Sequence, residues 1–173
     1  GAEQYIGRDP RLYSTIVYNA ATFGTHGTIY TRRDPGDNNG LNTVVRGSTT
    51  TGYYLKKFVN NISCKEPATY PHAWMIFRYG EILLNAAEAY NEAEGPAKAY
   101  SYINEVRARA GMPAYADMSQ SELRERIRNE RRIELAFEDH RFWDVRRWKI
   151  ADTTQRELYG VKIEKQADGT FNF

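Results

Sequence analysis

Apolar side chains recur at helical spacing through the middle of the chain, and this pattern constrains the fold more than any other feature of the sequence. One apolar stripe precedes the pair Gly95 and Pro96, and a second follows it and stops at Gly111. The stripes comprise Ile76, Phe77, Leu83, Leu84, Ala87 and Tyr90, then Ala99, Tyr100, Ile103 and Val106. Because proline is favoured at the first position of a helix and glycine just after the last, the pattern predicts an antiparallel helical hairpin.

This hairpin has the residue spacing of a degenerate tetratricopeptide repeat, with Tyr90 in the first helix, Ala99, Ile103 and Val106 in the second, and Pro113 after it. One such unit is visible in the sequence. Repeats of this kind need about three neighbours to bury a continuous core. We therefore expect further repeats on chain that this sequence does not include.

The rest of the second half also contains secondary-structure signals. Ser119 followed by Glu122 is a capping-box pattern, which predicts a third helix that runs to about Phe137. A short helical piece is expected at residues 141–148. The alternation around Asp168 and Gly169, between residues 159 and 173, predicts a β-hairpin.

The first half is different, since residues 1–73 are rich in Gly, Thr, Asn and Tyr and read as loops with short β-like pieces such as residues 12–18. The run from Asp34 to Gly40 is dense in turn residues. The sequence thus predicts a mainly α protein with a loop-rich segment at 1–73, a helical core at 74–150 and a hairpin tail at 151–173. So long an irregular segment is expected to pack on further chain or to form part of a site.

Composition excludes several functions. The net charge of +2 gives no field suited to nucleic acid, so no nucleic-acid partner is expected. No apolar run approaches the roughly 20 residues that cross a bilayer. The single cysteine, Cys64, and three histidines provide no metal-ligand cluster, and neither a metal nor a cofactor is expected.

Three segments carry a resemblance to a known family. They are RYGEILLNAAEA at 78–89, INEVRARAG at 103–111 and, above all, ERRIELAFEDHRFWDVRRW at 130–148. Weaker similarity occurs at 9–12 and 51–58. The chain resembles the C-terminal part of the SusD/RagB family of outer-membrane nutrient-binding lipoproteins. The resemblance implies that this chain is a fragment of a larger α-helical fold, truncated at both ends.

The resemblance also implies a function. Members of the family are lipid-anchored at the surface of the outer membrane, where they bind oligosaccharides for polysaccharide utilisation and deliver them to a SusC-like TonB-dependent transporter. The implied partners of this chain are therefore a glycan, that transporter and the absent N-terminal half of the same protein. The implied protein is a binder and not an enzyme.

Two carboxylates nevertheless look catalytic. Glu130 and Glu134 fall on the apolar stripe of the third helix, and side chains one turn apart are about 5–6 Å from each other, close to the separation in retaining glycosidases. Arginines at 78, 131, 141, 146 and 147 are numerous enough to pair with buried carboxylates and keep them ionised. Because a general acid needs a raised pKa, we expect structural ion pairs here, involving Arg78, Glu130, Glu134, Arg141 and Arg146.

The expected ligand surface lies in the loop-rich half, where aromatic and hydrogen-bonding side chains occur together. Its candidate residues are Tyr18, Phe23, His26, Tyr30 and Arg32. Trp74, Trp143 and Trp148 are expected to pack in the core or against the absent half, although an aromatic platform for sugars is the alternative for the last two. His140 is expected to cap or pack.

Three other functions remain open from sequence. A RagB-type protein would bind peptide with the same fold. A tetratricopeptide scaffold would bind proteins. A hydrolase would need an unpaired acid facing a second carboxylate across a cleft, which the sequence does not indicate.

Overall fold

The computed structural model describes residues 3–32, 49–59, 75–154, 157, 159–168 and 171–172. The predictions for the turn at Asp34 to Gly40, for Cys64 and for Trp74 lie outside these residues. The chain forms two compact units. The helical unit contains residues 9–11 and 73–154, and the loop-rich unit contains residues 1–8, 12–72 and 155–173.

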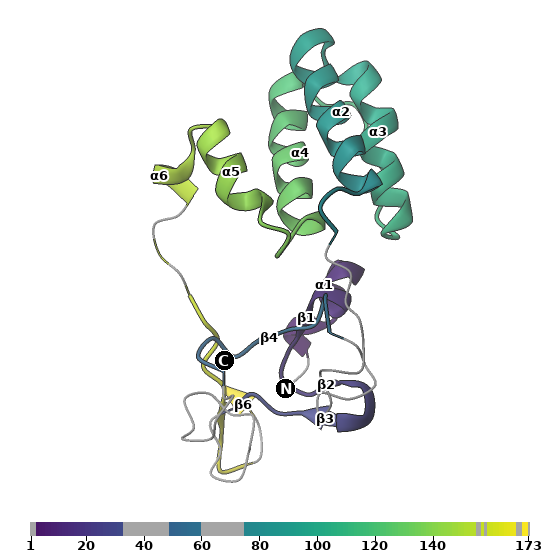
Figure 1. Cartoon of the computed structure of the whole chain (residues 1–173). Coiled ribbons are helices and arrows are strands. Elements are labelled where there is room, and N and C mark those ends of the chain that lie inside the picture. Colours follow the sequence, from purple (N-terminus) through teal and green to yellow (C-terminus); the bar gives the residue numbers. More distant parts are fainter. Residues whose placement is uncertain are drawn as a thin grey trace. The chain divides into compact units, whose positions relative to one another are not determined.

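The helical unit is built on three packed helices (Figure 1). Helix α2 spans Tyr79–Glu94, α3 spans Pro96–Arg109 and α4 spans Gln120–Glu134. Pro96 occupies the first turn of α3, and Gly95 between the helices has φ of 87°, a conformation that glycine adopts without a steric cost. The predicted hairpin and the mainly α fold are confirmed.

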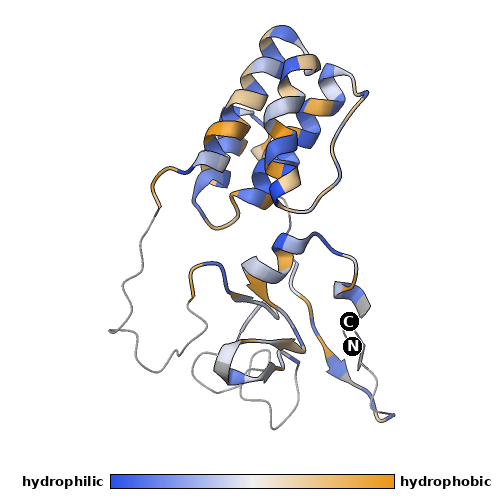
Figure 2. Cartoon of the chain, turned by 90° about the vertical axis from the view of Figure 1, so that its right-hand side faces the viewer, coloured by the Kyte–Doolittle hydropathy of each residue, from blue (hydrophilic) through white to orange (hydrophobic). Residues whose placement is uncertain are grey.

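Polar and apolar residues alternate along these helices (Figure 2), because one side of each helix packs against the other helices and the opposite side faces water. Their apolar sides form one buried cluster: Leu83, Leu84, Ala87, Ala99, Ile103, Val106, Leu123, Ile127 and Leu135. The first apolar stripe was predicted to begin with Ile76 and Phe77, and this part of the prediction was wrong. Ile76 and Phe77 precede α2 and are 74% and 76% exposed.

Helix α4 begins with the predicted capping box. The Ser119 hydroxyl oxygen accepts a hydrogen bond from the Glu122 backbone N–H, and the Ser119 N–H donates to Glu122 Oε2 at 2.9 Å. The helix ends at Glu134, three residues earlier than expected, and Phe137 beyond it has φ of 65°. Helices α5 (His140–Arg147) and α6 (Ala151–Thr154) follow.

The loop-rich unit consists of short elements. The 3-10 helix η1 spans Glu3–Tyr5, helix α1 spans Pro10–Thr15, and the 3-10 helix η2 spans Gly24–His26. The first two residues of α1 belong to the helical unit. Strand β1 (Ile16–Val17) pairs antiparallel with β4 (Tyr54–Leu55), and β2 (Ala21–Thr22) pairs antiparallel with β3 (Thr28–Ile29). The expected β-like piece at 12–18 is therefore helical up to Thr15, and only its end is a strand.

The C-terminal hairpin is present and packs within the loop-rich unit. Strands β5 (Glu164–Lys165) and β6 (Phe171–Asn172) pair antiparallel. The preceding segment is held by the Val161 N–H, which donates to Thr51 O at 2.9 Å. A Cβ on Gly52 would lie 2.6 Å from Val161 O, and Gly52 has φ of 84°. The close approach of these segments therefore requires glycine at this position.

Candidate binding site

A pocket of about 290 Å³ opens among the short strands of the loop-rich unit. The β1–β4 pairing places Val17 opposite Tyr54, and the turn between β2 and β3 brings two further aromatic rings to the same place. We call this the aromatic pocket. It is lined by Val17, Phe23, His26, Ile29, Tyr54, Leu55 and Val59.

The turn between β2 and β3 fixes two of the predicted ligand residues. The Phe23 N–H donates to Gly27 O at 2.9 Å, and the His26 N–H donates to Phe23 O at 3.0 Å. The two rings stack at 6.0 Å with an angle of 10° between their planes. Phe23 is buried while His26 is exposed, so the pair presents an apolar base with ring nitrogens beside it.

Tyr54 lines the pocket and is partly buried. Burial raises the pKa of Tyr54 above its ordinary value of 10.0, against a smaller lowering by a hydrogen bond with the Thr49 backbone. Tyr54 therefore stays protonated at neutral pH.

The other predicted ligand residues lie outside the lining of the aromatic pocket. The Arg32 guanidinium is 4.3 Å from the centroid of the Tyr30 ring, and Tyr30 is 37% exposed. Tyr18 instead packs in a cluster of tyrosines, with its ring centroid 4.2 Å from that of Tyr5 and 5.9 Å from that of Tyr13. The structure thus brings Phe23 together with His26, and Tyr30 together with Arg32.

Sequence reasoning did not select five of the lining residues: Val17, Ile29, Tyr54, Leu55 and Val59. Val17 meets Tyr54 and Leu55 because β1 pairs with β4, a contact between segments that lie far apart in the chain, and Ile29 lies on β3. The aromatic pocket has no carboxylate or cysteine among its lining residues. Its chemistry is that of a binding site, with ring faces for stacking and a few polar atoms for orientation.

The two carboxylates that look catalytic lie in the helical unit. Glu134 Oε1 accepts hydrogen bonds from Arg78 Nη1 at 2.7 Å and from Arg109 Nη2 at 2.6 Å, and its Oε2 accepts from Arg11 Nη1 at 2.9 Å. The Glu134 side chain is only 3% exposed. Three arginines from distant parts of the sequence therefore surround one buried carboxylate.

Glu130 has a similar environment one turn earlier. It is fully buried, and its Oε2 accepts a hydrogen bond from Arg107 Nη1 at 2.7 Å. Its Oε1 lies 2.7 Å from Arg11 Nη1, which is an ion-pair distance. Arg11 is thus shared by both carboxylates.

Arg11, Arg78 and Arg109 determine the protonation state of Glu134. Burial alone would raise its pKa, but hydrogen bonds from Arg11 and Arg78, with the charge of Arg109, outweigh burial and hold the pKa below the ordinary 4.5. A carboxylate with a lowered pKa stays ionised at neutral pH and is unsuited to general acid catalysis.

Arg78 links the start of α2 to the end of α4. Its Nε and Nη2 donate to the two carboxylate oxygens of Glu138 at 2.6 and 2.9 Å, and its Nη2 also donates to Glu134 O at 2.7 Å. A Cβ on Gly80 would lie 2.7 Å from Arg78 Nη1. Glycine at position 80 therefore leaves space for the guanidinium group.

The structure places the other two predicted ion-pair residues differently. Arg146 Nη1 donates to Phe142 O at 2.9 Å, and its guanidinium lies 3.4 Å from the centroid of the Phe142 ring. Burial and the charge of Arg132 lower the pKa of Arg141, while the charge of Asp144 opposes them. Among the described residues, no carboxylate lies within ion-pair distance of Arg141 or Arg146.

The carboxylates with lowered pKa values predict acid sensitivity. A group whose pKa is lower in the folded than in the unfolded state contributes stability above its unfolded pKa, and this contribution is lost as the pH falls through the folded pKa. For the buried Glu134 carboxyl, we expect the unfolding free energy to fall below about pH 4.5, by up to about 1.4 kcal/mol per pH unit.

Urea unfolding at a series of pH values measures this loss. The Glu134→Gln variant is the control, and its stability should depend less steeply on pH below 4.5, the ordinary pKa of this carboxyl. A stability that stays constant or rises on acidification would contradict the assignment of Glu134 as an ionised partner of the arginines.

The tryptophans and His140 have distinct environments. Trp148 is half-buried, and its Nε1–H donates to Glu88 Oε1 at 2.8 Å. Trp143 is 67% exposed on α5. His140 is the first residue of α5, and its Nε2 lies 3.6 Å from Glu81 Oε2. Trp148 is thus packed, whereas Trp143 presents its ring to the surface.

Among the described residues, no group of three or more His, Cys, Asp or Glu side chains is arranged to hold a metal ion. No helix in this part of the chain has the length and apolar character of a membrane span.

Known proteins resemble this chain in both sequence and structure. The SusD family matches residues 2–172. The SusD-like protein P25 of Formosa agariphila is 44% identical over 84 residues, which are 44% of this chain and 15% of that protein. The SusD-like protein P2 of the same organism is 43% identical over 92 residues, 48% of this chain and 17% of that protein.

Two solved structures from Bacteroides fragilis show the same fold. A SusD-like protein has a TM-score of 0.77 and 37% identity, and the match covers 91% of this chain and 31% of that one. A SusD-like carbohydrate-binding protein has a TM-score of 0.70 and 33% identity, covering 84% of this chain and 30% of that one. This chain spans less than a third of each of these relatives. Because the SusD family matches residues 2–172, the chain belongs to that family.

Proposed function

We propose that this chain is part of the glycan-binding component of an outer-membrane nutrient uptake system. The observation that supports the proposal best is the aromatic pocket, which contains ring faces and few polar atoms. The solved relative described as a carbohydrate-binding protein supports the same ligand class. The protein that contains this chain would hold an oligosaccharide without cleaving it.

The chemistry of the aromatic pocket suits a pyranose ring. The C–H faces of a sugar are apolar and pack on flat rings, while its hydroxyl groups need partners that orient them. In the pocket, the stacked rings of Phe23 and His26 provide the flat surface, and the exposed His26 ring also provides polar atoms. Val17 and Leu55 exclude water from part of the contact.

The remaining parts of the proposal follow from the family. The protein would be anchored by a lipid at the surface of the outer membrane and would deliver its ligand to a SusC-like TonB-dependent transporter. Catalysis is not part of the proposed function, because the buried Glu134 is held ionised by arginines.

A single array that carries both oligosaccharides and peptides tests the ligand class. We expect the chain to be retained by oligosaccharides and not by peptides. Retention by peptides alone would favour the RagB-type alternative, and retention by neither would contradict a ligand-binding role for this chain.

Variants of the aromatic pocket test the site. His26→Ala should weaken oligosaccharide binding by about tenfold, the size of one lost aromatic contact. Because His26 is exposed, the fold should be unaffected. Tyr159→Ala is the matched control, since Tyr159 is 83% exposed in the same unit and is not among the pocket's lining residues. Equal affinity of the His26 variant and the unaltered chain would remove the pocket from the site.

A further inference from the structure

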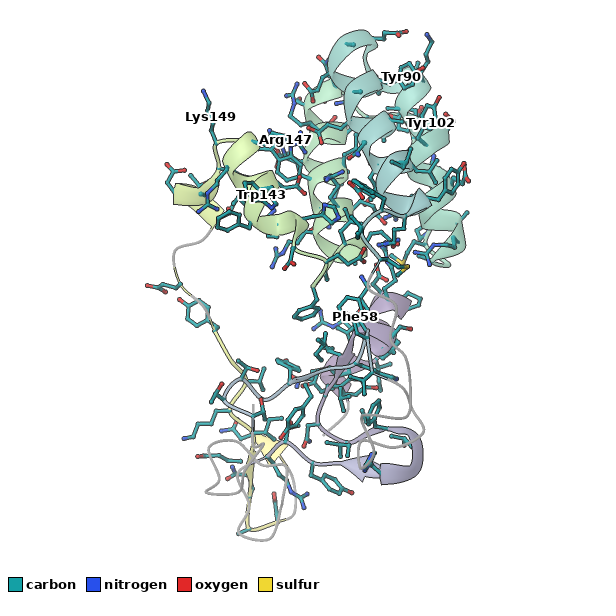
Figure 3. The ribbon with its side chains drawn as sticks, viewed as in Figure 1. Phe58, Tyr90, Tyr102, Trp143, Arg147 and Lys149 are labelled. Atoms are coloured by element: carbon teal, nitrogen blue, oxygen red, sulfur yellow. The ribbon has the colours of Figure 1, made fainter. Side chains whose placement is uncertain are left out.

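The helical unit contains a second concave surface, formed by α2, α4 and α5, with a volume of about 580 Å³. We call it the helix groove. Trp143 and Arg147 contribute to it from one side of α5 (Figure 3). Its polar lining residues include Glu81, Asn85, Glu88, His140 and Asp144.

Glu81 stands out among the carboxylates of the helix groove. The residue is 8% exposed, and its Oε2 is buried with no hydrogen-bond donor among the described residues. The closest basic atom, His140 Nε2, is 3.6 Å away, which is beyond hydrogen-bond distance. A buried carboxylate oxygen without a donor is costly, so a donor from a ligand would be favourable here.

The other carboxylates of the groove already have partners. Asp144 accepts two hydrogen bonds from Arg131, at 2.9 and 3.1 Å. Glu88 pairs with Arg147 and accepts from Trp148, and Glu92 pairs with Arg124. The available acceptor in the groove is therefore Glu81 Oε2.

Trp143 gives the groove an exposed ring. It is 67% exposed, and Phe142 contacts it edge to face, with the ring centroids 5.0 Å apart. His140 and Arg147 lie one turn before and one turn after it on α5, so all three side chains share one side of the helix. An exposed ring thus stands beside polar groups along the groove.

We propose that the helix groove is a second sugar-binding subsite, in which a neutral sugar ring stacks on Trp143 and one of its hydroxyl groups donates to Glu81 Oε2. The inference rests on the proposed function and adds a site to it.

The mixture of groups favours a neutral sugar over a cation. A hydroxyl group both donates and accepts, and the groove presents the acceptor of Glu81 beside the N–H donors of Arg147 and the amide of Asn85. A cation would use the acceptors alone and would be repelled by the guanidinium groups of Arg131 and Arg147.

Isothermal titration calorimetry of the 173-residue chain with short neutral oligosaccharides of glucose, mannose, galactose and xylose tests the subsite. Trp143→Ala should lower the affinity for the best of these sugars by about tenfold. Glu81→Gln should lower it less, because the amide retains one acceptor oxygen. Tyr79→Ala is the matched control: Tyr79 is 66% exposed on α2 but does not line the groove, and its loss should leave the affinity unchanged.

Trp143 is exposed, so its variant should fold, and a circular dichroism melt checks this. Equal affinity of Trp143→Ala and the unaltered chain would overturn the subsite, as would tighter binding of a lysine-containing peptide than of any sugar. If sugar binding is lost in His26→Ala but unchanged in Trp143→Ala, the subsite fails and the proposed function stands. If no sugar binds the unaltered chain, both fail.

Discussion

Replacement of Glu134 by alanine is expected to lower the free energy of unfolding by about 3–5 kcal/mol. The substitution leaves Arg11 and Arg78, whose side chains are 10% and 19% exposed, without the carboxylate that they share. Removal of one partner from a buried ion-pair network costs more than the pair contributes, because the remaining buried charges lose part of their compensation. Arg11 then keeps Asp9 and Glu130, and Arg78 keeps Glu138. Urea unfolding followed by far-ultraviolet circular dichroism measures the change in the helices.

Glu125→Ala on the same helix is the control for this prediction. Glu125 pairs with Arg128 at 2.9 Å, but its side chain is 68% exposed, and exposed pairs contribute at most about 1 kcal/mol. We expect a small change in stability for Glu125→Ala. Similar losses in the two variants would mean that the arginine cluster around Glu134 does not hold the helices together.

Replacement of Leu84 by alanine should cost about 2–5 kcal/mol, through the lost apolar contacts and the cavity that remains. Leu84 is fully buried in the cluster formed by α2, α3 and α4. The same unfolding measurement applies. Ile82→Ala, at a position on α2 that is 51% exposed, should change the stability much less. A larger loss of stability for Ile82→Ala than for Leu84→Ala would mean that α2 buries the side that carries Ile82.

The helices could be predicted from the sequence because their signals are local. A stripe repeating every turn, Pro96 at the start of α3 and the pair Ser119 and Glu122 each specify a helix within a few residues. The start of α2 was placed too early because Ile76 and Phe77 continue the apolar stripe, although they lie before the helix and face outward. Apolar character alone does not distinguish a buried from an exposed position.

Contacts between distant segments could not be predicted. Arginines were expected around Glu134, and Arg78 is one of them, but Arg11 is separated from Glu134 by 123 positions and has no local signal for its role. Arg146 lies on α5, where the Phe142 carbonyl and ring are within one turn, and its guanidinium binds there. The density of arginine in the sequence indicates ion pairs without specifying which arginine forms them.

In the candidate site, too, the contacts between distant segments could not be predicted from the sequence. Phe23 and His26 were selected from sequence and lie together because a tight turn joins them. Tyr54 was missed because it reaches the pocket through the pairing of β4 with β1. Tyr18 was selected for the same reason as Phe23, as an aromatic residue among hydrogen-bonding residues, but its ring packs on Tyr5. Local sequence therefore identified one side of the pocket.

The proposed function requires that the aromatic pocket binds a sugar. Nuclear magnetic resonance titration of the chain with the oligosaccharide that the array retains best, followed through the ring signals of Phe23, His26 and Tyr54, tests it most directly. We predict that these signals shift in a saturable way, while those of Tyr159 stay constant. Constant signals from all three pocket rings at a sugar concentration that saturates binding would contradict the claim.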